Sequence, residues 1–269
     1  MLVDSHCHLN FPEIVDNIQN VRLQMAEAQV GHALCVSVTL DKFPEVLNLA
    51  ERFDNFFASV GVHPDYEDIV EPTVDDLVTL AQHPKIIAIG ETGLDYFRLT
   101  GDLEWQRERF RVHIGAAVAT GKPLIIHTRS AAFDTLKIMK EEGASRVGGV
   151  MHCFTESLEV ALAAIEMGFY ISFSGIVTFK NATQLKEVAR AIPLNKMLVE
   201  TDSPYLAPIP FRGKTNQPAY VRFVAQEIAS LRGISFDEVM QTTTQNFFTL
   251  FKHAHPCDNV NFIKDSICN

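Results

Sequence analysis

Eight short apolar runs, separated by stretches with helical spacing, constrain the fold of this chain more than any other feature. The intervening segments, such as residues 105–120 and 181–192, carry apolar side chains at the period of an α-helix. Strands that alternate with helices call for a parallel sheet covered by helices. The eight runs are residues 2–3, 33–38, 56–62, 86–89, 123–126, 149–151, 169–173 and 197–199.

Eight such units within about 250 residues predict an α/β fold, the closed (β/α)8 TIM barrel. An open doubly wound sheet shows the same alternation and is the competing architecture. No internal repeat and no Ser/Gly-rich linker divides the chain. We therefore predict one barrel domain over residues 1–252, with a long loop at 203–217, and a C-terminal tail over residues 253–269.

The ends of the apolar runs favour the barrel, because most of them finish in a histidine or a carboxylate. In a (β/α)8 barrel the C-terminal strand ends converge on one mouth, where active sites lie. Residues from distant parts of the chain would then meet in one place. The polar residues that follow the runs are His6, His8, His63, Glu91, His127, His152 and Asp202.

Each of these residues also has an ordinary structural explanation. A pair such as His6 and His8 shares a strand face but is more often two unrelated polar residues than a metal pair. The segment 90–93, Gly-Glu-Thr-Gly, is compatible with a turn, and Asp202 before Ser-Pro is compatible with a cap. The coincidence of four histidines and two carboxylates on one predicted rim favours a metal site.

Neutral imidazoles and carboxylates suit a divalent ion such as Zn²⁺, Mn²⁺ or Mg²⁺. Six ligands are too many for one open catalytic zinc, but they fit two ions roughly 3.5–4 Å apart with a bridging carboxylate. The identity of the ions stays open, because imidazoles favour Zn²⁺ or Mn²⁺ whereas Mg²⁺ prefers oxygen. Cys7 and Cys153 neighbour the ligand histidines, and we expect both to turn away and pack under the outer helices.

Six ordered motifs together resemble the TatD family of metal-dependent deoxyribonucleases, over residues 2 to about 250. They are the segments 2–10 (LVDSHCHLN), 61–64 (GVHP), 90–95 (GETGLD), 123–129 (PLIIHTR), 152–154 (HCF) and 200–205 (ETDSPY). The resemblance implies a barrel of the amidohydrolase-like group, a cytoplasmic location and a site for two divalent metals.

The resemblance also implies roles for the site residues. Glu91 would bridge the metals, and Asp202 would bind metal and act as the catalytic base. No carboxylated lysine is needed as a bridge, because the strand that ends in Glu91 has its nearest lysine, Lys85, at its start. The remaining metal ligands would be His6, His8, His127 and His152, and the residues facing the substrate phosphate would be His63 and Arg129.

The activity implied is 3′→5′ exonuclease cleavage of DNA at single-stranded 3′ ends. A metal-activated water would attack phosphorus, Asp202 would take its proton, and Arg129 would stabilise the developing charge. Tyr205, directly after Asp-Ser-Pro, is a candidate for stacking on a base, with a structural role as the alternative.

Two other functions remain open. An amide, lactone or ester hydrolase, including one acting on an aminoacyl-tRNA ester, would use the same dinuclear site. The cationic residues expected near the mouth, His63, Arg129, Arg212 and Lys214, suit phosphates better than neutral amides. A non-catalytic metal-binding or scaffold protein would be marked by a missing ligand, and none of the six positions lacks one.

The charge balance limits how DNA is held. With 23 Lys and Arg against 33 Asp and Glu, the formal charge of −10 excludes a broad basic face. It predicts salt-sensitive engagement of a short end rather than tight binding along a duplex. Five scattered cysteines indicate no disulfide framework and fit a reducing cytosol. No apolar run approaches the roughly 20 residues of a membrane helix, and no protein partner is evident.

Overall fold

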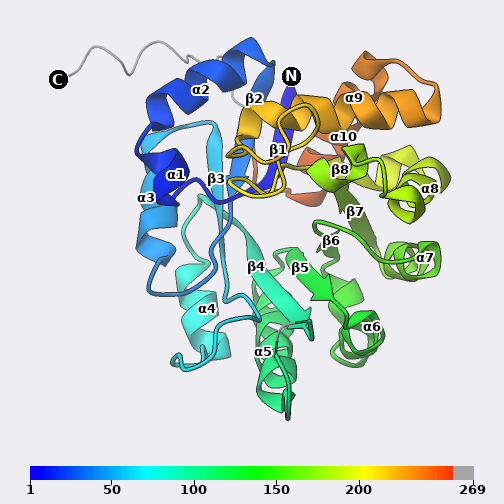
Figure 1. The fold of residues 1–269 in the computed structure, drawn as a ribbon. Helices are drawn as coiled ribbons and strands as arrows, with labels where there is room; N and C mark the ends of the chain where they lie inside the picture. The colour runs from blue at the N-terminus through cyan, green and yellow to red at the C-terminus, as the bar shows by residue number, and fades with distance from the viewer. Residues whose placement is uncertain (98, 257–269) are drawn as a thin grey trace.

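Eight parallel strands form one sheet in the order of the chain, as shown by a computed structural model that describes residues 1–97 and 99–256 (Figure 1). Every strand is buried along its length or nearly so, as expected for a parallel sheet with covered faces. The strands are β1 Leu2–Cys7, β2 Val30–Cys35, β3 Phe56–Val60, β4 Ile86–Asp95, β5 Leu124–Arg129, β6 Gly149–Met151, β7 Phe169–Phe173 and β8 Met197–Val199.

The segment after β8 returns to β1 and closes the ring. Asp202 N donates to His6 O at 3.0 Å, and His8 N donates to Ser203 O at 2.8 Å. The structure therefore confirms the predicted (β/α)8 barrel rather than an open sheet.

Helices lie outside the ring of strands (Figure 1). The α-helices are α1 Pro12–Val15, α2 Ile18–Glu27, α3 Phe43–Arg52, α4 Val74–Leu80, α5 Glu104–Thr120, α6 Ala132–Glu141, α7 Leu158–Glu166, α8 Thr183–Ala191, α9 Val221–Arg232 and α10 Phe236–Leu250. The short 3₁₀ helices are η1 Ala144–Arg146, η2 Gly175–Thr178, η3 Leu194–Lys196 and η4 Pro218–Tyr220. Both helical segments named from the sequence, 105–120 and 181–192, contain a helix.

Each of the eight apolar runs overlaps a strand, and β1 to β5 differ from the predicted bounds, β2 and β4 by the most residues. β2 begins at Val30 and ends at Cys35, so that residues 36–38 (Val-Ser-Val) lie beyond it. β4 continues to Asp95 through the Gly-Glu-Thr-Gly segment, which is therefore strand rather than a simple turn. Glu91 lies between the paired residues Ile89 and Thr92 of β4, and its N–H donates to Ser37 O at 3.1 Å, which fixes its backbone more firmly than a loop would.

The barrel interior is filled by a layer of buried side chains to which every strand contributes. Phe247 and Phe251 from α10 and the residues after it pack against this layer. Ala254, in the predicted tail, is also buried there, whereas residues 257–269 lie outside the described part of the chain. The strand residues of the layer are Val3, Leu34, Phe57, Ile87, Ala88, Ile125, Val150, Tyr170 and Leu198.

In β1 the alternation of side chains is interrupted before the site. Val3 belongs to the interior layer, but Cys7, four residues on, packs in the outer cluster between strands and helices. The pairing of β1 with β2 is irregular between Asp4 and Cys7, as in a β-bulge. This change of face turns His6 toward the barrel axis and Cys7 outward, as predicted for Cys7.

Among the described residues, no helix is long and apolar enough to cross a membrane.

Candidate metal centre

The six predicted ligands meet at the C-terminal mouth of the barrel, around the carboxylate of Glu91. Glu91 Oε2 lies 3.3 Å from His6 Nε2 and 3.9 Å from His8 Nε2. Glu91 Oε1 lies 2.7 Å from His152 Nε2 and 3.2 Å from His127 Nδ1. The two oxygens of one carboxylate thus face different histidines, as a bridging ligand requires.

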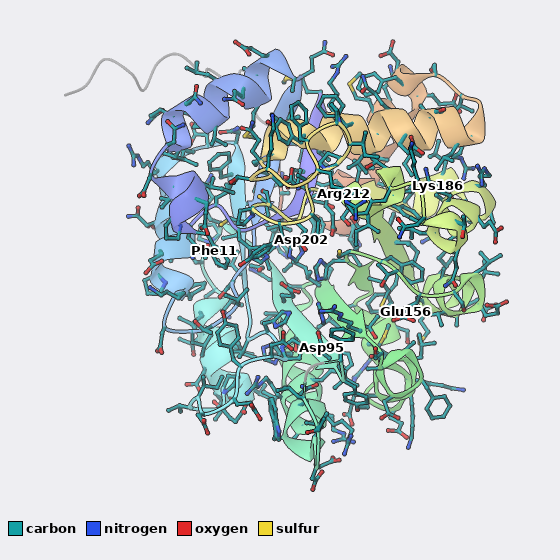
Figure 2. All side chains as sticks on the ribbon, viewed as in Figure 1. Phe11, Asp95, Glu156, Lys186, Asp202 and Arg212 are labelled. Atoms are coloured by element: carbon teal, nitrogen blue, oxygen red, sulfur yellow. The ribbon has the colours of Figure 1, made fainter. Side chains whose placement is uncertain are left out.

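Asp202 lies on the β8 side of the same cluster (Figure 2). Its Oδ1 is 3.3 Å from His8 Nε2 and 3.6 Å from His6 Nε2. Its side chain is 15% exposed, compared with 3% for Glu91. Of these two carboxylates, Asp202 is therefore the one that solvent water reaches more readily.

A cavity of about 820 Å³ opens over the cluster. Asp202 and Glu91 line it, together with the three residues predicted to face the substrate, His63, Arg129 and Tyr205. In the described chain Arg129 lines this cavity, whereas Arg212 and Lys214 do not.

Hydrogen bonds on the far side of each ring indicate which nitrogen carries the proton. His127 Nε2 is 3.0 Å from Asp95 Oδ2, and His152 Nδ1 is 3.3 Å from Glu200 Oε1. Since carboxylates accept, these outer nitrogens donate, so the nitrogen that faces Glu91 is the one that would offer its lone pair to a metal in the neutral ring. A histidine whose outer nitrogen donates to a carboxylate in this way is typical of metal-ligating histidines.

His63 has the opposite tautomer. The backbone N–H of Asp65 donates to His63 Nδ1 at 3.1 Å, so the proton of the neutral ring is on Nε2. That Nε2 lies 3.3 Å from Glu91 Oε1. His63 can therefore donate a hydrogen bond into the cavity, and in this state it has no lone pair there for a metal.

The electrostatics of the cluster favour positive charge. Burial raises the pKa of Glu91, but His152, His63 and His6 lower it more, and the pKa lies well below its ordinary value. Burial lowers the pKa of His152, but Glu91 and Glu200 raise it well above the ordinary range. The buried carboxylates thus hold a proton on His152, and a bound metal cation would replace that positive charge.

The donor set fits divalent ions. Three groups have ligand atoms within 4.8 Å of one another: His6, His152 and Asp202; His6, His8 and Glu91; and His63, Glu91 and His127. In the third group His63 presents its Nε2–H, so Glu91 and His127 are the candidate ligands there. Nε2 of His6 and of His152 is buried and has no hydrogen bond of suitable geometry in the described chain. Buried polar nitrogens of this kind are costly unless something binds them.

Three features of the site differ from the sequence-based expectation or were missed by it. Cys153 does not pack under the outer helices: it adopts a φ of 42° and lines the cavity, with Sγ 3.3 Å from Ser174 Oγ. Asp95 and Glu200, which orient the two histidines, were given no role. The signal was present, since Asp95 ends β4 and Glu200 directly follows β8, as the ligands follow their own strands.

An eight-stranded parallel barrel whose mouth gathers histidines around buried carboxylates defines a metal-dependent hydrolase. The family model described as "TatD related DNase" matches residues 3–252. The chain therefore belongs to the TatD family, as the sequence motifs indicated.

Relatives and solved structures agree with this assignment. The uncharacterized metal-dependent hydrolase YcfH of Escherichia coli K12 is 47% identical over 254 residues, covering 93% of this chain and 95% of that protein. The human deoxyribonuclease TATDN3 is 31% identical over 264 residues, covering 93% of this chain and 94% of that protein. The crystal structure of YJJV, a TatD homologue from Escherichia coli K12, matches with a TM-score of 0.87 at 29% identity. The match covers 93% of this chain and 98% of that chain.

Proposed function

We propose that this enzyme is a 3′→5′ exodeoxyribonuclease that cleaves phosphodiester bonds at single-stranded 3′ ends of DNA. The family description and the name of the human relative support DNA as the substrate. One feature of the cavity carries the proposal. A hydrogen-bond donor, His63, and a cation, Arg129, line the same cavity as the ligand cluster, and a phosphate group needs both.

The ligand set of the proposed dinuclear site is Glu91 as the bridge with His6, His8, His127, His152 and Asp202. When bound there, two divalent cations (Mg²⁺, Mn²⁺ or Zn²⁺) would lower the pKa of the attacking water and offset charge on the phosphate.

Asp202 is the proposed base. Burial raises its pKa, but the hydrogen bond from His8 and the nearby histidines lower it below the ordinary value, so it is ionised near neutral pH. Its backbone has a φ of 57° and is fixed by hydrogen bonds to His6 O and from Tyr205 N. A partly exposed, ionised and rigidly held carboxylate can accept the proton of a water entering the cavity.

His63 and Arg129 are the proposed phosphate contacts. His63 presents its Nε2–H, and Arg129 presents a guanidinium that stacks on Phe97 with Cζ 3.8 Å from the ring centroid. Contact with the Phe97 ring limits the rotamers of Arg129. The N–H groups, which point outward in the plane of the guanidinium, stay free for oxygen acceptors. These donors stabilise the charge that builds on the phosphate oxygens.

Tyr205 is the proposed stacking surface for a base of the bound strand. It is 54% exposed, lines the cavity and contacts Phe11, another lining residue, edge-to-face at 6.1 Å between centroids. An exposed aromatic ring at the mouth offers a base-stacking platform without sequence preference. We also propose a cytoplasmic location, which the unpaired state of Cys7, Cys35 and Cys153 supports.

A panel of metals and substrates tests the proposed function. Metal-free enzyme reloaded with Mg²⁺, Mn²⁺ or Zn²⁺ is assayed on single-stranded DNA, on RNA of the same sequence and on a neutral ester. We expect metal-dependent cleavage of the DNA, and a 5′-labelled strand should shorten one nucleotide at a time. Cleavage of the ester alone would identify a carbonyl hydrolase, and shortening of only a 3′-labelled strand from its 5′ end would reverse the polarity.

A further inference from the structure

Helix α5 carries a row of buried polar side chains that no part of the proposed chemistry uses. Gln106, Arg109 and His113 lie three and four residues apart, and so on one face of the helix. Their exposed fractions are 0%, 3% and 0%. Buried polar groups need partners, and all three find theirs on the backbone just before or at the site.

Arg109 binds the segment that carries His63. Its guanidinium donates to His63 O at 3.0 Å and to Tyr66 O at 2.8 Å. The same group forms a forked ion pair with Glu71, at 2.7 and 2.5 Å. Three points of the segment between β3 and α4 are thus fixed to one planar side chain.

His113 holds the residue before His63. Val62 N donates to His113 Nε2 at 2.9 Å, and His113 Nδ1 is 2.8 Å from Arg109 O. The backbone on both sides of the His63 ring is therefore attached to α5.

Gln106 holds the end of β4. Asp95 N donates to Gln106 Oε1, and Gln106 Nε2 donates to Asp95 O, both at 3.0 Å. The carboxylate of this Asp95 is the partner of His127 Nε2 (Figure 2 labels Asp95). A shift of the Asp95 backbone would rotate the His127 ring away from Glu91.

We propose that Gln106, Arg109 and His113 are positioning residues that set the geometry of one side of the metal centre. On that side the Nε2–H of His63 orients Glu91 Oε1, the oxygen of the bridging carboxylate that His127 also faces. The inference rests on the proposed function, because it assigns these side chains to the orientation of that site. Residues behind the ligands of a metal commonly change metal affinity when replaced, by about 10–100-fold.

Binding of Mn²⁺ to the intact, metal-free protein tests this, measured by titration calorimetry well below the unfolding temperature. Arg109→Met and Gln106→Met should each weaken Mn²⁺ binding at least about 10-fold. The matched control is Arg111→Met, the same substitution two residues along α5, where the arginine pairs with Glu104 and Glu108 at the surface. It should leave Mn²⁺ affinity unchanged.

The affinity of the folded protein separates positioning from simple stabilisation, which would lower only the unfolding temperature. Wild-type Mn²⁺ affinity in folded Arg109→Met and Gln106→Met would overturn the proposal. If Arg109→Met fails to fold, Arg109→Lys decides by the same comparison, since it keeps a charge for Glu71 but cannot span the three acceptors.

The result also distinguishes this inference from the proposed function. A wild-type protein that binds no divalent metal would overturn both. A wild-type protein that binds Mn²⁺ and cleaves no DNA would overturn the nuclease alone, and the affinities of the variants would still decide the positioning role.

Discussion

At the scale of single residues, the site depends on how protons are distributed around Glu91. The rings of His127 and His152 donate outward, to Asp95 and Glu200, and turn their other nitrogen toward Glu91. His63 keeps its proton on the inside, because the Asp65 amide occupies its other nitrogen. Residues of the same type therefore differ in chemistry: the first two rings are suited to ligate a metal, and the third is suited to donate a hydrogen bond.

Replacing Asp202 by asparagine should abolish cleavage and leave the fold intact. The amide keeps the size of the side chain but cannot accept the proton of the attacking water, so we expect the rate to fall at least about 100-fold. Rates on single-stranded DNA with saturating metal, together with thermal unfolding of the same preparation, check this. Near wild-type cleavage by Asp202→Asn would show that another group is the base.

His113 should make the protein sensitive to acid. Burial lowers its pKa from 6.5 to about 4 in the folded state, so between these pH values the unfolded chain binds a proton that the folded chain does not. The contribution of His113 to the free energy of unfolding should therefore be fully present above pH 6.5. It should be lost as the pH falls toward 4, which lowers the free energy of unfolding by about 3 kcal/mol.

The variant His113→Gln keeps an acceptor for Val62 N and removes the titration. Urea unfolding at neutral pH and near pH 4.5 should show a smaller loss of stability in the variant than in the wild type. An equal loss in both proteins would show that His113 does not contribute to acid sensitivity.

At the scale of elements, strand β4 determines where Glu91 points. Gly90 and Gly93 have φ values of 141° and 133°, which side chains rarely adopt. A Cβ on Gly93 would also overlap the carbonyl oxygen of His127 on β5. These glycines let β4 approach β5 closely on both sides of Glu91, so the motif is a packing requirement as well as a ligand position.

Gly93→Ala should therefore destabilise the protein by about 2–4 kcal/mol, from backbone strain and from the contact with β5. Gly121→Ala is the control, since Gly121 also has a positive φ, 67°, but open space around its Cβ position. It should cost only about 1 kcal/mol. Urea midpoints of both variants measure the difference, and equal losses would mean that the close approach to β5 contributes nothing.

The elements show why the sequence predicted the strands better than the orientation of their side chains. Hydrophobic runs identify buried strands, and polar residues that follow them identify the mouth of a barrel. The irregular pairing of β1 between Asp4 and Cys7 changes which face a residue lies on, and no local pattern encodes it. Cys153 was misplaced for a similar reason, because strict alternation was assumed past the end of β6, where its backbone has a positive φ.

At the scale of the whole molecule, the negative formal charge of −10 and a cation site are consistent with each other. Part of that charge, Glu91 and Asp202, lies buried in the candidate centre, where histidines hold both carboxylates ionised. The metal-free protein keeps these charges in a small volume, and bound cations would neutralise them.

Removal of metal should therefore lower the stability of the entire barrel. A ligand present at 100 times its dissociation constant adds about 2.7 kcal/mol, which for a chain of this size corresponds to roughly 5–10 °C. Thermal unfolding in a chelator and after addition of Mn²⁺ measures the shift, with Glu91→Gln expected to show a smaller one. Identical curves with and without Mn²⁺ would contradict a metal site that links the strands.

The layer of side chains inside the barrel has a further consequence. Every strand contributes to it, and Phe247 and Phe251 pack against it from α10 and the residues after that helix. Within the described residues, the cavity over the ligand cluster is thus closed on the side of the barrel interior. Substrate cannot pass through the barrel, so under the proposed function a DNA strand would approach, and the product would leave, from the mouth at the C-terminal strand ends.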